Sequence, residues 1–192
     1  GLKNLFKIIS IANTKHFYKT ARILRSEIEE LREGLLVGSG CYRGEVFYMA
    51  ETRNEETLKK VIDFYDYVEV QPPEVYEHLV WGHDINSDKD VKMCINKIIK
   101  CTKEAGKIIV ATGDVHHISR DDKLYREIIV NQKVPGGGRH PLARVLDHYH
   151  KIPSQHFRTT DEMLNDFSFL DEELRKEIVI TNPKKILDMA EI

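Results

Sequence analysis

A short apolar run, Ile108 to Ala111, is followed closely by two side chains that can bind metal ions, Asp114 and His116. Four consecutive apolar residues of this kind predict a strand covered on both faces, as strands of parallel sheets are. In proteins built from βα repeats, the loops at the carboxyl ends of the strands carry the active site. Residues two apart on an extended backbone point to the same side, so Asp114 and His116 can face one ion.

The chemistry of this pair suits a transition metal. A carboxylate oxygen beside a neutral imidazole fits zinc, manganese or iron, and such an ion can generate hydroxide or polarise a phosphate. Two ligands fall short of the usual three or four. A hydrogen-bonded pair at the end of a buried strand is therefore an equal alternative.

The composition sets limits on the classes of function. A chain of 192 residues with a formal net charge of −2 predicts one sizeable domain and gives no support for a duplex-binding module, which normally carries a basic excess. Cys41, Cys94 and Cys101 have no CxxC spacing, and neither a secretory signal nor a bilayer-length apolar run is seen. A reducing, cytoplasmic location is the expectation. The first residue is Gly1 rather than Met, as in a piece of a longer protein or after a tag.

Cys41 is the third candidate ligand. It ends the segment Leu35 to Cys41, which we predict to be a buried strand broken by two glycines. Its position at a strand end matches that of Asp114 and His116, although a structural thiol is about as well supported. Cys94 and Cys101 lie in a predicted helix and are assigned to the core.

The remaining elements follow from periodicity and capping signals. Helices are predicted at 2–12, 26–32, 44–51, from Asn54 to Tyr65, at 88–105, 121–130, 161–167 and 172–179, and from Asn182, with a further strand at 67–71. His78 and His83, and likewise His148, His150 and His156, are interpreted as surface or loop residues. Residues 134–141 are glycine-rich but lack the Gly-Lys-Ser/Thr of a phosphate loop, so a flexible surface loop is predicted.

Several segments together carry a resemblance to a known family. They are 1–7, 32–41, 64–76, 110–116 and 157–164, in that order. The sequence closely resembles the polymerase and histidinol phosphatase (PHP) domain of PolC-type DNA polymerase III alpha subunits. The resemblance implies an α/β fold: a partial, distorted (β/α)7 PHP barrel over residues 1–157, then a helical segment over 158–192 leading toward the polymerase palm.

The resemblance implies that the candidate ligands belong to a larger metal cluster. Cys41, Asp114 and His116 match three of nine ligand positions, and the resemblance implies zinc or manganese there. The family has tyrosine where this chain has His117, so a neighbouring role is considered for His117 rather than ligation. The family's opening His-x-His motif is absent, so the site is expected to be incomplete.

The resemblance also implies the functional setting. The parent would be a DNA replication enzyme, a magnesium-dependent polymerase with a proofreading exonuclease. This chain would be a scaffold between exonuclease and palm, without either active site. Its partners would be the rest of the polymerase chain and, through it, DNA. The alternatives are a metal-dependent phosphoesterase of the PHP family and a module that binds replisome proteins. Missing strands would leave an open sheet edge through which the chain could self-associate.

Overall fold

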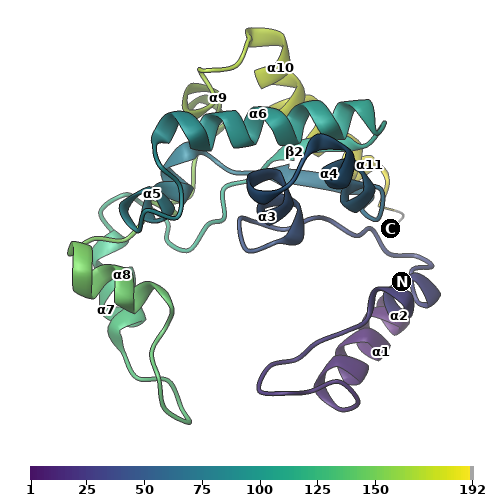
Figure 1. The fold of residues 1–192 in the computed structure, drawn as a ribbon, viewed down its shortest axis with the longest axis horizontal. Coiled ribbons are helices and arrows are strands. Elements are labelled where there is room, and N and C mark those ends of the chain that lie inside the picture. The colour runs from purple at the N-terminus through teal and green to yellow at the C-terminus, as the bar shows by residue number, and fades with distance from the viewer. Residues whose placement is uncertain (191–192) are drawn as a thin grey trace.

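The fold mixes helices with one small parallel sheet, as a computed structural model that describes residues 1–190 shows (Figure 1). Strands β1 (Tyr67–Val70) and β2 (Ile108–Ala111) pair in parallel, with Val68 beside Ile109 and Val70 beside Ala111. Side chains alternate across a strand, so these four apolar residues share one face and are all buried. Both strands were predicted from sequence.

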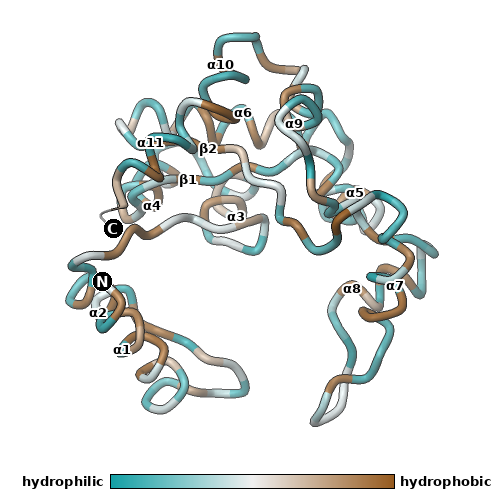
Figure 2. Tube along the Cα trace, turned by 180° about the vertical axis from the view of Figure 1, so that it is seen from behind, coloured by the Kyte–Doolittle hydropathy of each residue, from teal (hydrophilic) through white to brown (hydrophobic). Residues whose placement is uncertain are grey.

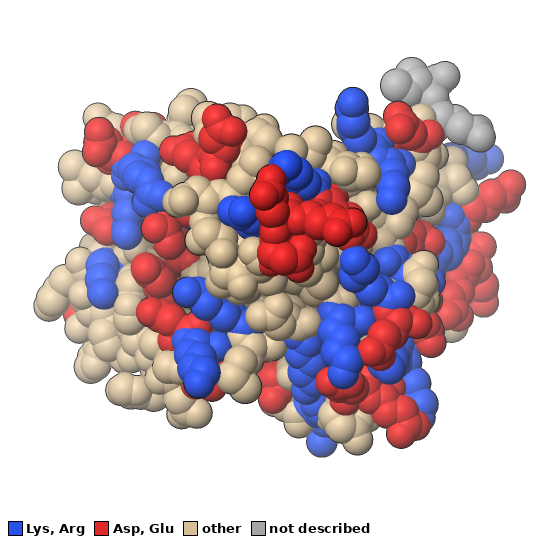
Figure 3. All heavy atoms as spheres, turned by 90° about the horizontal axis from the view of Figure 1, so that it is seen from above, with Lys and Arg blue, Asp and Glu red and all other residues tan. Residues whose placement is uncertain are grey.

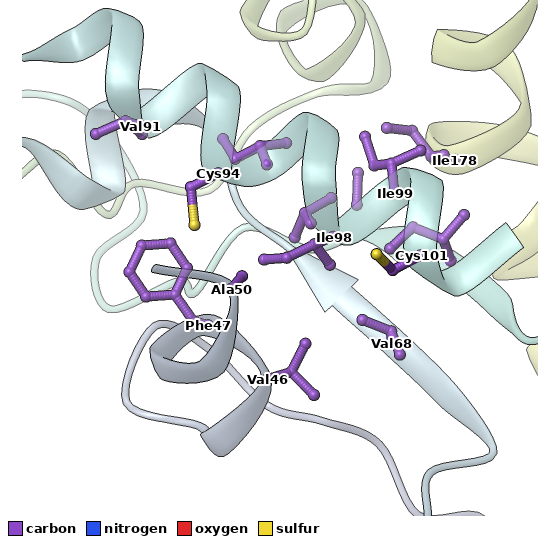
Figure 4. Packing of buried hydrophobic residues seen from close by; sticks show 14 of the residues in the cluster. Val46, Phe47, Ala50, Val68, Val91, Cys94, Ile98, Ile99, Cys101 and Ile178 are labelled. Atoms are coloured by element: carbon purple, nitrogen blue, oxygen red, sulfur yellow. The ribbon is translucent and has the colours of Figure 1, made fainter. Parts of the chain in front are cut away.

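The long helix α6 (Asp88–Glu104) covers the apolar face of the sheet. It begins where the Ser87 hydroxyl accepts a hydrogen bond from the Asp90 backbone N–H, and acidic residues in its first turn suit the positive end of the helix dipole. The stripe that helical periodicity predicts over 88–105, Val91, Ile95, Ile98, Thr102 and Ala105, is buried except for the half-buried Ala105. The assignment of both cysteines to the core is confirmed (Figure 4). The buried residues of this helix are Val91, Cys94, Ile95, Ile98, Ile99, Cys101 and Thr102.

Two short helices, α3 (Glu45–Thr52) and α4 (Glu55–Ile62), pack beneath α6. As predicted, Asn54 caps α4, its side chain accepting from the Thr57 backbone N–H at 2.9 Å. After β1 the chain enters a 3-10 turn, η1 (Pro73–Tyr76), and helix α5 (Glu77–Trp81). Phe47 of α3 stacks on Tyr76, with ring centroids 4.7 Å apart, which joins α3 to η1.

The C-terminal helices complete the same core. These are α9 (Thr160–Asp166), α10 (Glu172–Lys176), the π-helical turn η2 (Glu177–Thr181) and α11 (Asn182–Asp188). Phe167 and Ile178 are fully buried in the cluster that α6 and the strands form. The buried side-chain amide of Asn182 donates to the Ile109 carbonyl at 2.8 Å. This bond satisfies a backbone acceptor on the edge of β2 that faces away from β1.

Two helical arms project from this body, as Figures 1 and 2 show. One consists of α1 (Leu2–Asn13) and α2 (Arg25–Glu30), the other of α7 (Lys123–Asn131) and α8 (Leu142–Tyr149). Both arms carry large apolar side chains in solvent-exposed positions. The exposed apolar residues are Leu2, Leu5, Phe6 and Ile9 on α1, and Leu124, Tyr125, Ile128 and Ile129 on α7.

The predicted buried strand at 35–41 is wrong. A single parallel bridge joins Gly38 to Tyr67. The Ser39 N–H donates to the Tyr67 carbonyl at 3.2 Å, but the next rung, from the Glu69 N–H, goes to the Ser39 hydroxyl at 2.9 Å instead of to a carbonyl. A side chain that takes the place of a backbone acceptor ends the ladder after one residue, and Leu36 stays 38% exposed.

No helix was predicted between residues 131 and 160, but the structure contains helix α8 there. The glycine-rich segment before α8 is a loop, as predicted. Acidic and basic side chains alternate over the face above α6 and α10 (Figure 3), in keeping with the small net charge. None of the helices described between residues 1 and 190 is long and apolar enough to cross a membrane.

Candidate functional site

Asp114 and His116 lie side by side in the loop that follows β2. The strand pairing runs one residue past the end of β2, because the Thr112 N–H donates to the Val70 carbonyl at 2.9 Å. Asp114 then adopts a φ of 45°, in the left-handed region that aspartate tolerates better than most residues. The turn leaves the Asp114 Oδ1 and His116 Nε2 atoms 3.5 Å apart.

The surroundings of this pair lower the pKa of the His116 imidazole. Burial lowers the pKa of His116, and the nearby Arg126 guanidinium lowers it further, while Asp114 acts in the opposite direction. The other carboxylate oxygen of Asp114 accepts a hydrogen bond from the Gln155 side chain at 2.8 Å. A neutral imidazole beside an oriented carboxylate is the form in which both groups can bind a cation.

Cys41 lies in the turn between the Gly38–Tyr67 bridge and α3, half-buried and unoxidised. Gly40, just before it, has a φ of 69°, which a residue with a Cβ rarely adopts. Within residues 1–190, no three His, Cys, Asp or Glu side chains are grouped closely enough to hold a metal ion. The donors present are therefore an Asp-His pair and a separate thiol, which do not fit a closed zinc site of three or four protein ligands.

A chain of hydrogen bonds links the carboxyl ends of the two strands beneath this site. The Tyr76 hydroxyl donates to the side-chain oxygen Oε1 of Gln71 at 2.7 Å, the side-chain Nε2 of Gln71 donates to the Thr112 hydroxyl, and that hydroxyl donates to the Glu69 carboxylate, both at 2.9 Å. Tyr76 is fully buried, and burial raises the pKa of its phenol far above the ordinary value. The network fixes the strand ends from which the loop with Asp114 departs.

His117 has both ring nitrogens in hydrogen-bonding contact with the backbone. Its Nδ1 lies 2.7 Å from the Ser119 carbonyl, and its Nε2 accepts from the Gln155 N–H at 3.3 Å. These contacts are compatible with one tautomer, protonated at Nδ1. In this geometry His117 joins the loop after β2 to the segment before α9 and leaves no nitrogen free for a ligand.

The chain is similar to a known domain family and to several known proteins. Residues 1–72 match the family model of the PHP domain. The DNA polymerase III PolC-type of Bacillus subtilis (strain 168) is 47% identical over 191 residues, 100% of this chain. The same-named protein of Lacticaseibacillus paracasei is 44% identical over 191 residues, and that of Listeria welshimeri 41%, each again covering 100% of this chain.

The whole length of the chain is thus similar to one part of PolC-type DNA polymerase III. It spans 13% of the length of these PolC-type relatives. The match runs through both candidate positions, the turn with Cys41 and the loop with Asp114 and His116, because it covers the whole chain. The resemblance inferred from separate short segments is thereby confirmed over the full length.

Two predicted surface histidines are in fact buried. His78 packs edge-on against Tyr42, with ring centroids 4.7 Å apart, and burial lowers its pKa to about 4. His156 is 2% exposed, with Nδ1 3.0 Å from the Ser154 hydroxyl. The expectation of surface positions was wrong because neither segment has a periodicity from which burial can be predicted. His83, His148 and His150 are exposed, as expected.

Two arginines were not among the candidate site residues predicted from the sequence. They are Arg43, two residues after Cys41, and Arg126 on α7. Burial lowers the pKa of Arg126, and Arg43 lowers it further, while Asp114 and Tyr42 act in the opposite direction. The available signal was the position of Arg43 just after a proposed strand end, where functional side chains of βα-repeat proteins gather.

Proposed function

We propose that this chain acts as a scaffold segment in a PolC-type replicative DNA polymerase, between the exonuclease and the palm. The observation that carries the proposal is the match of the whole chain to 13% of PolC-type DNA polymerase III. The chain itself would have no polymerase or exonuclease active site. Its partners would be the rest of that polymerase and, through it, DNA and the replisome.

The fold supports a place in a barrel. Helix α6 covers one face of the two parallel strands, and on the other face a groove of about 300 Å³ lies between Tyr67, Glu69 and Val110 of the strands and residues of α11. A barrel buries both faces of each strand, so a groove on the second face suits a partial (β/α)7 barrel. We propose that residues 1–157 form the later part of this barrel and that residues 158–192 lead toward the palm.

Cys41, Asp114 and His116 would contribute ligands to a metal centre that other parts of the longer protein complete. Asp114 Oδ1 and His116 Nε2 lie 3.5 Å apart, whereas the Cys41 thiol stands in a separate turn after a glycine with a positive φ. Zinc or manganese suits this donor set, and magnesium would serve the parent polymerase. The bound ion would supply Lewis acidity.

The metal proposal is tested in the longer protein by elemental analysis. We expect Asp114→Asn, His116→Ala and Cys41→Ser each to lower the zinc or manganese content at least tenfold, since removing a ligand weakens a site by more than removing a supporting group does. Asp63→Asn is the matched control, because Asp63 is exposed at the end of α4. Unchanged metal content in all three variants would exclude this assignment.

The scaffold proposal is tested with the 192-residue chain alone. We expect no primer extension with magnesium and deoxynucleotides, under conditions in which the longer protein extends. Primer extension by the purified chain, retained through a further purification step, would contradict the proposal. Light scattering on the same sample tests self-association, which predicts a dimer at high concentration.

A second candidate function is a metal-dependent phosphoesterase, favoured by the Asp114–His116 pair at 3.5 Å within a chain that matches the PHP domain. Hydrolysis of a phosphomonoester by the chain with added manganese or zinc, lost in Asp114→Asn but kept in Asp63→Asn, would support it. The absence of turnover with every divalent ion tried would favour the scaffold.

A further inference from the structure

The first 26 residues carry a concentration of positive charge that the rest of the chain does not share. They contain six basic side chains and no Asp or Glu, so all 31 acidic residues lie after residue 26. The six basic residues are Lys3, Lys7, Lys15, Lys19, Arg22 and Arg25. A local excess of this kind attracts polyanions even in a chain whose formal net charge is −2.

Ion pairs neutralise only part of this charge. Lys15 pairs with Glu27 at 2.7 Å, and Arg25 pairs with Glu45. The other four side chains are exposed and have no ion pair among residues 1–190; they are Lys3, Lys7, Lys19 and Arg22. Their charges are therefore available to a ligand.

Between α1 and α2 the chain forms a turn that exposes two aromatic rings. Phe17 is 56% exposed and Tyr18 is 63% exposed. The Tyr18 N–H donates to the Thr20 carbonyl at 3.2 Å, and Lys19 between them has a φ of 61°, in the left-handed region that lysine rarely adopts. Adjacent exposed rings in such a turn mark an interaction surface more clearly than a single exposed apolar residue does.

Two cations lie over the ring of Tyr18. Lys19 Nζ is 5.7 Å from the ring centroid, and the central carbon of the Arg22 guanidinium is 5.5 Å from it. Both distances are within the range of cation–π interactions. An exposed ring with cations beside it is the combination by which proteins bind single nucleic-acid strands, because the ring stacks on a base and the cations attract the phosphates.

The two ends of this turn are held in place. The His16 N–H donates to the Ile11 carbonyl at 3.2 Å, and the Arg22 N–H donates to the Ala12 carbonyl at 3.3 Å, so both ends are bonded to the last turns of α1. The loop that joins α1 to α2 can be followed in Figure 1. An ordered turn loses less conformational entropy when it binds a ligand than a free segment does.

We propose that the turn 17–22 binds a single nucleic-acid strand, with an unpaired base stacked on Tyr18 and phosphates contacted by Lys19 and Arg22. A single strand is favoured over a duplex because the bases of a duplex are already stacked on one another. It is favoured over an acidic protein because carboxylates alone would leave the exposed rings without a partner. The inference goes beyond the scaffold proposal and does not depend on it, since in that proposal DNA is reached only through the rest of the polymerase.

The test measures binding of the 192-residue chain to a fluorescent oligothymidylate by anisotropy at low salt. We expect Tyr18→Ala to weaken binding about tenfold, the scale of one lost base stack, and Tyr18→Phe to bind as the unmodified chain does, because the ring remains. Tyr48→Ala is the matched control, since Tyr48 is a ring on α3 that is 53% exposed.

An oligonucleotide made of abasic sites separates stacking from charge. It keeps the phosphates, so Tyr18→Ala should leave its affinity unchanged. Arg22→Gln should reduce the slope of log K against log salt concentration by about 0.7 for both oligonucleotides. Arg53→Gln is the control for charge, because Arg53 is exposed at the end of α3, and its slope should equal that of the unmodified chain.

Three results would overturn the proposal. They are the absence of binding to oligothymidylate, equal affinity of Tyr18→Ala and the unmodified chain with matching circular dichroism spectra, and equal weakening of the abasic oligonucleotide by Tyr18→Ala. Binding of polyglutamate or of phosphatidylglycerol vesicles in place of oligothymidylate would also overturn it, because the partner would then be an acidic protein or a membrane. None of these measurements depends on metal content or primer extension, so the scaffold proposal is judged separately.

Discussion

Two groups of polar side chains flank the loop after β2, and they differ in how many of their atoms are paired. In the first group, Asp114 and His116 keep part of their polar surface free, and the side chain of His116 is 41% exposed. In the second, the buried side chain of Arg158 contacts two carboxylates and two carbonyls, and both nitrogens of His117 have partners. Each group contains one of two adjacent histidines.

The difference shows that a free hydrogen-bonding atom, rather than the residue type, distinguishes a candidate ligand from a structural side chain. His116 and His117 are neighbours in sequence, yet one points its Nε2 toward a carboxylate and the other has both nitrogens bonded to the backbone. The bonds of both His117 nitrogens to the backbone hold the loop in place, and the loop in turn positions His116. Substitutions in the paired group should therefore reduce stability more than substitutions in the open group.

The largest effect is expected for Arg158→Met. Arg158 Nη2 lies 2.9 Å from Glu74, and Arg158 Nε lies 2.5 Å from Asp166, whose side chain is 12% exposed. Removing the guanidinium leaves a largely buried carboxylate without a partner, so the free energy of unfolding should fall by about 3–5 kcal/mol. Urea denaturation measures it. Arg120→Met is the control, because Arg120 pairs with the same Glu74 from an exposed position and should cost less than about 1 kcal/mol.

A smaller loss is expected for His117→Phe. The substitution keeps the ring volume but leaves the Ser119 carbonyl and the Gln155 N–H without their partner. Unsatisfied buried groups of this kind lower the free energy of unfolding by about 1–3 kcal/mol. Thermal and urea unfolding should agree, and stability equal to that of the unmodified chain would show that water replaces the ring nitrogens.

Acid should destabilise the chain through His78. Its pKa of about 4 in the folded state is below the ordinary value of 6.5, so the unfolded state binds more protons between these values. Stability is then full above pH 6.5 and is lost as the pH falls toward 4, by on the order of 1 kcal/mol once residual water access is allowed for. His78→Gln should flatten the dependence on pH in this window, with His83→Gln as the exposed control.

The smallest effect is expected for His116→Ala. This side chain is 41% exposed and its contact with Asp114 is at 3.5 Å, so the free energy of unfolding should change by less than about 0.5 kcal/mol. The comparison with His117→Phe is direct, because the two residues are adjacent. A loss as large as that of His117→Phe would mean that the open pair is structural as well.

The parts of the fold that could be predicted from sequence are those governed by local contacts. Asn54, Thr159 and Asp171 cap helices through atoms three residues away, so their roles are visible in a short stretch of sequence. The stripe of α6 repeats at helical spacing and is buried as predicted. The strand predicted at 35–41 is wrong because its pairing depends on a distant contact. The Glu69 N–H of β1 donates to the Ser39 hydroxyl rather than to a backbone carbonyl.

For the candidate site, the prediction that Asp114 and His116 lie close together agrees with their 3.5 Å separation, although a left-handed turn at Asp114 and not an extended backbone produces it. Arg43 had a signal in its position after a proposed strand end, whereas Arg126 could not be predicted. Arg43 and Arg126 come from a turn and a helix far apart in sequence, and their approach depends on how the arm of α7 leaves the body. The burial of His156 likewise depends on a segment that crosses the loop after β2. Contacts of this kind have no local sequence signal.

The sequence by itself determined most of the helices, the two parallel strands, the resemblance to PolC-type proteins and the closeness of Asp114 to His116, because each depends on periodicity, caps or residues a few positions apart. It did not predict α5 and α8. Only the tertiary structure decided which histidines have free nitrogens, where the third strand fails, and that the charge of Asp114 acts on Arg126. The physical reason is that desolvation and charge act through space, and the chain order of residues does not fix their distances in space.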